Sequence, residues 1–196
     1  MAEQEIEFKF ELEQSAYLTL TQRLGRPTDE RRFANCYYTV PKNTRRDWVL
    51  RLRCEDEHKE LTLKLGRLVS TGLYESMEYT AMVETRDPDG WLDTEPIRVL
   101  RQEISSEPLI YQGESRNHRL LFDAPIEVGR TWEVDHCELP NGEEFYELEV
   151  EVQGEEPPDI EELRGRLLHW LDACGIAVKP STTTKYKRFL ASCREP

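Results

Sequence analysis

Charged and apolar residues alternate in the segment EIEFKF, Glu5–Phe10, and this alternation limits the structures that the segment can adopt. Successive side chains of a β-strand point to opposite faces, so the charged residues share one face while Ile6, Phe8 and Phe10 share the other. A strand at the surface of a sheet would turn its charges to water and bury its apolar face. A strand that lines a polar interior would do the reverse.

The same alternation recurs along the chain. In VLRLR the side chains of Arg51 and Arg53 share a face, in LTLKL Lys64 lies opposite three leucines, and WEVD aligns Glu133 with Asp135. The further predicted strands are Cys36–Val40, Val49–Arg53, Leu61–Leu65, Leu73–Val83, His118–Asp123, Trp132–Asp135 and Glu147–Val152. Turns are predicted at 58–60 and, with an Asn-Gly pair, at 140–144. Roughly eight strands, mostly in hairpin order, favour an antiparallel sheet or barrel.

Four segments have a helical pattern. The first ends at Gly25 and the third, the strongest, follows Pro157 and Pro158. The predicted helices are Gln14–Leu24, Trp91–Ile104, Asp159–Cys174 and Thr182–Cys193. We find no internal repeat and no clear linker, so residues 1–196 are expected to form a single, mainly β domain of the α+β class.

The composition narrows the choice of partners and compartment. A net charge of −13 disfavours nucleic acid, unless the positive charges are gathered in one place. We expect no membrane association and no signal peptide, because no apolar run approaches the ~20 residues of a span and acidic residues begin at Glu3. The five cysteines are scattered without metal-type spacing, which is typical of reduced thiols in a cytoplasmic protein.

The signs of the charged faces differ from strand to strand. The first and last strands present acidic residues, and the middle strands present Arg51, Arg53 and Lys64. In a closed barrel the first and last strands can be neighbours, which would bring several carboxylates together. Such carboxylates repel one another unless protons or a cation neutralise them, and Mg²⁺ or Mn²⁺ takes oxygen ligands of this kind. Arginine and lysine opposite them would suit phosphate, so the pattern predicts a polyphosphate site.

These motifs, in this order, resemble the CYTH or triphosphate tunnel metalloenzyme superfamily. EIEFK matches its ExExK motif, and YYT, RLR, TLK, a glutamate-bearing strand, an arginine strand, an aspartate, ELE and a terminal TKY follow in the family's order. The stretch ELTLKLGRLVSTGLYE is most similar to the small bacterial branch of inorganic triphosphatases, often labelled adenylate cyclases. TKY replaces the more usual SKY and keeps a hydroxyl.

The resemblance implies an eight-stranded antiparallel closed β-barrel with flanking helices, whose interior is a hydrophilic tunnel. The implied metal ligands, for Mg²⁺ or Mn²⁺, are Glu5, Glu7, Glu147 and Glu149; together with Lys9 they are the implied catalytic residues. The implied phosphate-binding residues are Lys9, Arg51, Arg53, Lys64, Lys185 and either Arg116 or Arg119. Glu78, with Glu75 as an alternative, and Asp135 would be supporting acidic residues.

The resemblance implies an enzyme that hydrolyses inorganic triphosphate to pyrophosphate and phosphate, acting as a monomer or homodimer on this small molecule. Three alternatives stay open: a class IV adenylate cyclase, a thiamine triphosphatase, and a non-catalytic polyphosphate- or nucleotide-binding module. A thiamine slot would need aromatic residues, for which the candidates are Tyr37, Tyr38, Trp48 and Tyr79.

Overall fold

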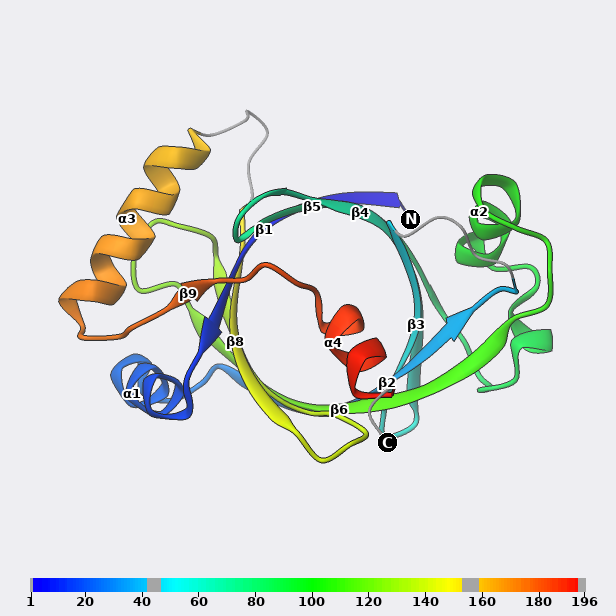
Figure 1. The fold of residues 1–196 in the computed structure, drawn as a ribbon, viewed down its shortest axis with the longest axis horizontal. Helices are drawn as coiled ribbons and strands as arrows, with labels where there is room; N and C mark the ends of the chain where they lie inside the picture. The colour runs from blue at the N-terminus through cyan, green and yellow to red at the C-terminus, as the bar shows by residue number, and fades with distance from the viewer. Residues whose placement is uncertain (1, 42–46, 153–158, 194–196) are drawn as a thin grey trace.

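The computed structural model describes residues 2–41, 47–152 and 159–193. In these ranges eight strands close into a barrel, seen end-on as a ring in Figure 1. They are β1 (Ala2–Leu12), β2 (Asp29–Thr39), β3 (Trp48–Glu55), β4 (His58–Ser70), β5 (Leu73–Met82), β6 (Ile110–Asp123), β7 (Thr131–Glu138) and β8 (Glu144–Glu151).

Every neighbouring pair of these strands is antiparallel. Around the barrel the order is β5-β4-β3-β2-β6-β7-β8-β1, and a pairing of β1 with β5 closes it. The single strand β1 pairs with β5 through residues 2–8 and with β8 through residues 7–12. The predicted closed barrel is therefore confirmed, and the first strand lies beside the last one.

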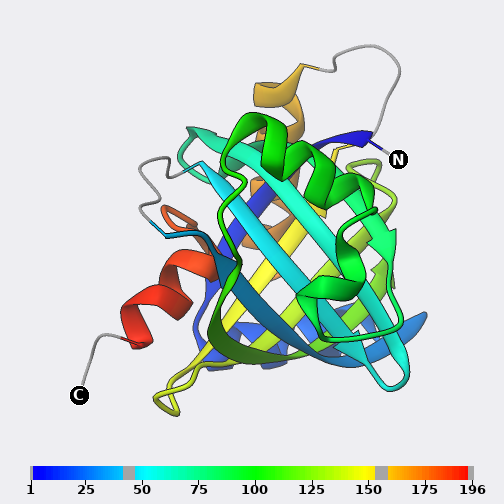
Figure 2. The same cartoon turned by 90° about the vertical axis from the view of Figure 1, so that its right-hand side faces the viewer.

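Helices cover the outside of the barrel and one of its ends. In Figure 1, α1 (Gln14–Leu24) and α3 (Ile160–Ala173) lie on one side, and α2 (Glu95–Glu103) lies on the other. The C-terminal helix α4 (Lys185–Ser192) lies across one opening, as the turned view in Figure 2 also shows. The two remaining short elements are the 3-10 turn η1 (Pro88–Trp91) and the strand β9 (Lys179–Pro180). No helix in the described ranges is long and apolar enough to cross a membrane.

Caps explain where two of the helices begin. The side chain of Asp159 accepts hydrogen bonds from the backbone N–H groups of Glu161 and Glu162 at the start of α3, and that of Thr184 accepts one from Lys187 at the start of α4. Gly25 ends α1 at a φ of 82°, in the left-handed region that glycine tolerates.

The structure differs from the predicted elements in several places. β2 begins at Asp29 and β6 at Ile110, earlier than predicted. The first halves of both strands are polar, and a register shift after Tyr37 interrupts the alternation, so the sequence pattern did not indicate strands there. The turn predicted at 58–60 lies at residues 56–57, where Asp56 takes a φ of 50°. The helix predicted at 91–104 is shorter in the structure. Trp91 ends the preceding turn η1, and α2 begins at Glu95, just before Pro96.

The apolar core lies outside the barrel, between the strands and the helices. On one side Phe8, Phe10 and Trp132 pack with Leu20 of α1 and Leu171 of α3, all almost fully buried. The second cluster packs the leucines of β3 and β4 against η1 and α2; its main members are Leu50, Leu52, Leu61, Leu63, Trp91, Ile97 and Leu100. Burial on β3 alternates residue by residue, so its arginines face the interior.

Candidate active site

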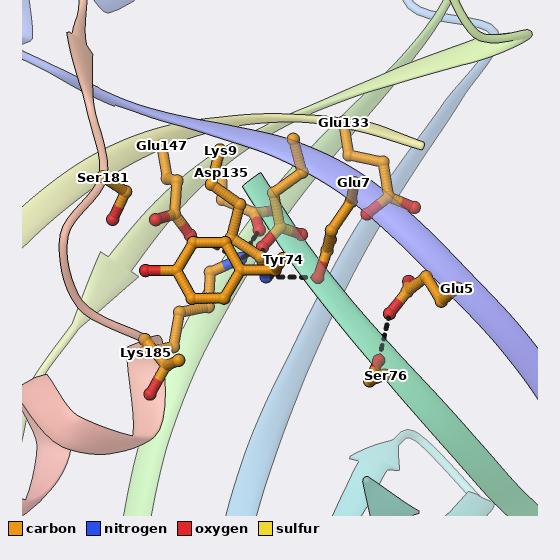
Figure 3. Close-up of polar contacts among 12 residues, drawn as sticks. Glu5, Glu7, Lys9, Tyr74, Ser76, Glu133, Asp135, Glu147, Ser181 and Lys185 are labelled. Carbon is orange, nitrogen blue, oxygen red and sulfur yellow. Dashed lines mark hydrogen bonds and ion pairs between the residues drawn. The ribbon is translucent and has the colours of Figure 1, made fainter. Parts of the chain in front are cut away.

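Charged side chains from seven strands and from α4 meet inside the barrel, and Figure 3 shows part of this group. They point inward because the alternate residues of each strand pack in the two outer clusters. The interior acids include Glu5, Glu7, Glu78, Asp135, Glu147 and Glu149, and the interior bases include Lys9, Arg51, Arg53, Lys64, Arg119 and Lys185. The structure thus brings together nearly all of the residues predicted from the motifs.

Glu149 of β8 lies at the centre of the largest ion-pair network. Its Oε1 atom lies 2.7 Å from Nζ of Lys9 and 2.8 Å from Nζ of Lys185, and its Oε2 atom lies 2.7 Å from Nη2 of Arg119. Burial alone would raise the pKa of Glu149, but these three cations hold it well below its usual range. Glu149 therefore stays ionised and fixes three bases from three different elements.

Asp135 of β7 is fully buried and orients Arg119. The Arg119 guanidinium donates from Nε to Oδ1 at 2.8 Å and from Nη2 to Oδ2 at 2.7 Å, and Lys185 also contacts Oδ2. Burial opposes ionisation of Asp135, yet Arg119 and Lys185 lower its pKa. A two-bond fork of this kind fixes the plane of the guanidinium as well as its position.

Lys185 reaches the interior because the segment before α4 is tied to the barrel wall. The backbone N–H of Ser181 donates to the carbonyl oxygen of Lys9 at 2.9 Å, next to the pairing of β9 with β1. The hydroxyl of Tyr74 donates to the carbonyl oxygen of Thr183, also at 2.9 Å. α4 then begins with Lys185 directed into the barrel, where its Nζ lies 3.2 Å from Glu147.

A second network joins three strands around Lys64 of β4. Its Nζ lies 2.8 Å from Oε2 of Glu5 and also contacts Glu78, and the hydroxyl of Ser76 donates to Glu5 at 3.2 Å. Burial raises the pKa of Glu5, but Lys64, a hydrogen bond with Glu78 and Lys9 together outweigh it, and the net shift is downward. Burial and a hydrogen bond with Glu5 raise the pKa of Glu78 to about 7. These opposite shifts mean that Glu78 takes up a proton more readily than Glu5.

Two interior carboxyls are poorly neutralised. Burial raises the pKa of Glu7 to about 8, with repulsion from Glu5 and Glu149 adding to it, although Lys9 lies 2.8 Å away. Burial likewise raises the pKa of Glu147, and neither of its carboxylate oxygens has a hydrogen-bond donor among the described residues. Both positions therefore favour an added positive charge, either a proton or a cation.

The arginines of β3 are paired more loosely within the described residues than the other interior bases. The Nε atoms of Arg51 and Arg53 are buried and have no hydrogen-bond partner among the described residues. Arg53 stacks over the ring of Phe33 at 4.4 Å, and its nearest described carboxylate, Glu60, is 3.7 Å away. Burial, together with the charges of Arg51 and Arg119, lowers the pKa of Arg53. An anion bound between these two guanidiniums would give their buried donors a partner. It would therefore be stabilised more here than beside the bases that already have close carboxylates.

The structure decides between the alternatives that the motifs left open. Arg119 is buried in the interior, whereas Arg116 is exposed on the outer face, so the prediction that Arg116 binds phosphate is wrong in geometry. Glu78 contacts Lys64 inside the barrel, whereas Glu75 pairs with the exposed Arg67 outside it. In both pairs the two candidates lie three residues apart, and strand alternation allows only one of them to point inward.

Glu133 of β7 is an interior residue to which the sequence analysis gave no role. Its carboxylate contacts Nη1 of Arg119, and burial raises its pKa against the effect of that guanidinium. The WEVD alternation had already placed Glu133 on the face of Asp135, so the signal was present in the pattern.

The donor chemistry fits a hard divalent cation, although the side chains are not arranged around one. No three His, Cys, Asp or Glu side chains in the described ranges form a metal site as they stand. A cavity of about 180 Å³ is nevertheless lined by Glu5, Glu7, Glu133, Glu149 and Glu151, among other residues. Carboxylate oxygens are the ligands that Mg²⁺ and Mn²⁺ prefer, and the pKa of Glu7 is raised here by burial and, to a smaller extent, by the charges of Glu5 and Glu149. These residues could hold such an ion once Lys9 and Lys185 release Glu149.

Comparisons with known structures find the same fold in several proteins. A candidate adenylyl cyclase from Hippeastrum, with a dominant triphosphatase activity, has a TM-score of 0.82 at 22% identity, covering 98% of each chain. A candidate adenylate cyclase from Bacillus halodurans has a TM-score of 0.70 at 23% identity, covering 96% of this chain and 98% of that one. The RNA triphosphatase domain of a mimivirus mRNA capping enzyme has a TM-score of 0.53 at 14% identity, covering 88% and 89%.

A comparison with curated protein sequences found no match. The CYTH domain family, in contrast, matches residues 3–186, which include every interior charged residue described above. The chain therefore belongs to the CYTH domain family.

Proposed function

We propose that this protein hydrolyses inorganic triphosphate to pyrophosphate and phosphate inside the barrel, in a reaction that depends on Mg²⁺ or Mn²⁺. The observation that carries the proposal is the division of the interior into two walls. Arg51 and Arg53 present unpartnered donors on one wall, and clustered carboxylates present oxygen ligands on the other. The dominant triphosphatase activity of the Hippeastrum protein supports the same reaction class.

The bases of the interior bind and orient the substrate. Arg51 and Arg53 receive phosphate oxygens at their Nε atoms, which have no partner among the described residues, and Arg53 gives up no more than its 3.7 Å contact with Glu60. Lys9, Lys64 and Lys185 exchange some of their carboxylate contacts for phosphate oxygens, which carry comparable charge. Arg119 keeps its orientation through Asp135 during this exchange. Phosphoryl transfer depends mainly on such positioning and charge neutralisation.

Glu5, Glu7, Glu147 and Glu149 would hold the metal ion or ions. When bound, a divalent cation neutralises the phosphate charge and lowers the pKa of a bound water. Of the two acids on β8, Glu147 is the better candidate to accept a proton from the attacking water, because its pKa is raised and its described ion pair is a single one, with Lys185 at 3.2 Å. Glu149, held by three cations with a strongly lowered pKa, is a poor base.

The positions of the aromatic residues favour an inorganic substrate over thiamine triphosphate. Tyr38 and Trp48 belong to the outer cluster under α2, against which Tyr79 also packs. Tyr37 faces inward but packs on Tyr186 and Phe189 of α4. These residues therefore form no common slot for an aromatic ring.

The test offers purified full-length protein tripolyphosphate, ATP and thiamine triphosphate separately, with Mg²⁺ or Mn²⁺, and measures orthophosphate and cyclic AMP. We expect the highest kcat/KM for orthophosphate release from tripolyphosphate. Cyclic AMP from ATP would assign a cyclase instead, a preference for thiamine triphosphate would assign that hydrolase, and binding without turnover would assign a binding module.

Two sets of variants connect the activity to the interior. Glu5→Gln and Glu7→Gln should abolish metal-dependent turnover while the circular dichroism spectrum stays that of the folded barrel. Arg119→Gln should reduce turnover strongly, whereas Arg116→Gln, exposed on the same strand, should leave it unchanged. Equal activity of the two arginine variants would contradict the proposal.

A further inference from the structure

Three uncharged polar side chains are buried on the arginine wall of the barrel. Asn35 of β2 and Thr62 of β4 are each 1% exposed, and Asn117 of β6 is 5% exposed. Nδ2 of Asn35 donates to Oδ1 of Asn117 at 3.4 Å. The other amide atom of each asparagine, Oδ1 of Asn35 and Nδ2 of Asn117, has no partner in the described part of the chain, and the same holds for Oγ1 of Thr62.

The strand register places these groups on both sides of the arginine pair. Asn35 lies directly opposite Arg53, and Thr62 lies directly opposite Arg51. Residues opposite each other in an antiparallel pair point to the same face, so all four side chains face the interior. Nε of each arginine is likewise unpartnered. Donors from β3, β4 and β6 are therefore unsatisfied within one part of the wall.

Such a concentration of unsatisfied groups is unusual inside a protein. More than ~90% of buried polar groups have a hydrogen-bond partner, because leaving one without a partner costs stability. The available atoms are mainly donors, and they flank two guanidinium groups. The chemistry that satisfies several donors and two positive charges together is an oxyanion with several oxygens. Glu5, Asp135 and Glu149 are instead paired with the other four bases, and Glu60 is 3.7 Å from Nη1 of Arg53, so neither Nε atom has a carboxylate partner among the described residues.

We propose that Thr62 and Asn117 complete an anion site with Arg51 and Arg53 that binds the terminal phosphoryl group of the triphosphate. Asn35 is a positioning residue in this site, because its hydrogen bond leaves Nδ2 of Asn117 available for a phosphate oxygen. The inference rests on the proposed function for its substrate. It adds uncharged, directional donors that hold the terminal phosphoryl group of the triphosphate, at the end remote from the proposed metal-binding carboxylates.

The experiment measures the binding of tripolyphosphate by isothermal titration calorimetry, with EDTA present so that no metal takes part. Thr62→Val and Asn117→Leu should each weaken binding about ten- to a hundredfold, the loss expected for one hydrogen bond to a charged group. Thr62→Ser keeps the hydroxyl and should bind like the wild type. Pyrophosphate should show the same factors, because it also ends in a terminal phosphoryl group.

Thermal unfolding separates this role from a structural one. Since Oγ1 of Thr62 has no partner among the described residues, Thr62→Val should leave the unfolding midpoint unchanged or raise it, while it weakens binding. A lowered midpoint together with wild-type affinity would show a structural role and overturn the inference.

The outcomes also distinguish this inference from the proposed function. Wild-type affinity in Thr62→Val and Asn117→Leu would overturn the anion site alone. If the wild type binds no tripolyphosphate in EDTA, the anion site is again overturned, but turnover of tripolyphosphate with Mg²⁺ would still support the proposed function. Failure of that turnover would overturn the proposed function.

Discussion

Arg119 and Asp135 join β6 to β7 through two hydrogen bonds inside the barrel, at 2.8 and 2.7 Å. They lie directly opposite each other in the strand register, and Asp135 has no exposed surface. The pair orients a guanidinium that also reaches Glu149 on the next strand. The orientation of one basic group thus depends on a residue that has no need to touch the substrate.

Asp135→Asn should therefore reduce both stability and activity. The lowered pKa of Asp135 means that the network favours its ionised form, so a neutral amide leaves Arg119 and Lys185 with less compensation. Loss of one partner from a buried pair costs about 3 kcal/mol in the free energy of unfolding. Urea unfolding and turnover of tripolyphosphate measure the two effects. Glu138→Gln, exposed on the same strand, is the control that should change neither.

The stability of the metal-free protein should fall as the pH rises from about 5 to 9. Burial raises the pKa values of Glu7 and Glu78 to about 8 and about 7, above the usual glutamate value of 4.5. The folded state therefore binds more protons than the unfolded state in this range, so this contribution to stability is present at low pH and lost as the pH rises through the raised values. Urea unfolding in EDTA at several pH values measures the profile.

Glu7→Gln should flatten that pH profile, because an amide does not titrate. Glu75→Gln, on the outer face, should leave the profile as in the wild type. A wild-type slope in Glu7→Gln would show that other groups are responsible.

Lys185→Gln should lower turnover of tripolyphosphate about a hundredfold, the effect typical of removing one group that stabilises transition-state charge. Lys185 contacts three interior carboxylates and is the base that α4 contributes. Lys187→Gln, exposed on the same helix, should keep full activity. A comparable loss in both variants would indicate that the helix as a whole has been disturbed.

Leu171→Ala should destabilise the protein without changing its chemistry. Leu171 is fully buried between α3 and the outer face of the barrel, so its truncation should lower the free energy of unfolding by about 3 kcal/mol. Because the core lies outside the barrel, kcat at low temperature should stay near that of the wild type. Leu18→Ala, at a site 58% exposed, should change stability by less than ~0.5 kcal/mol. A large fall in kcat for Leu171→Ala would show that the two layers are coupled.

The alternation of charged and apolar residues predicted much of this arrangement. It placed Arg51 and Arg53 on one face of β3 and Glu147 and Glu149 on one face of β8, and the structure has them so. Arg116 and Arg119 could not be separated in this way, because SRNHRLLFD lacks a clear alternation. The contacts of Glu149 with Lys9, Arg119 and Lys185 depend on the closure of the barrel and the path of the chain before α4. No local pattern contains that information.

Neutral interior residues are the harder case for sequence reasoning. Asn35, Thr62 and Asn117 are uncharged, and in a strand they are indistinguishable from solvated surface residues. Only their burial with at least one polar atom lacking a partner among the described residues, beside the two arginines, sets them apart.

The apolar core lies outside the barrel and the charged residues lie inside it. Substitutions at neighbouring positions of one strand should therefore have different effects. Leu52 lies between Arg51 and Arg53, so adjacent positions of one strand meet unrelated demands. A comprehensive substitution scan that records abundance and turnover separately should give two profiles along β3, each repeating every second residue and offset by one position. Insertion of a single residue would exchange the two sets, turning leucines into the tunnel and arginines under the helices, and both properties would be lost together.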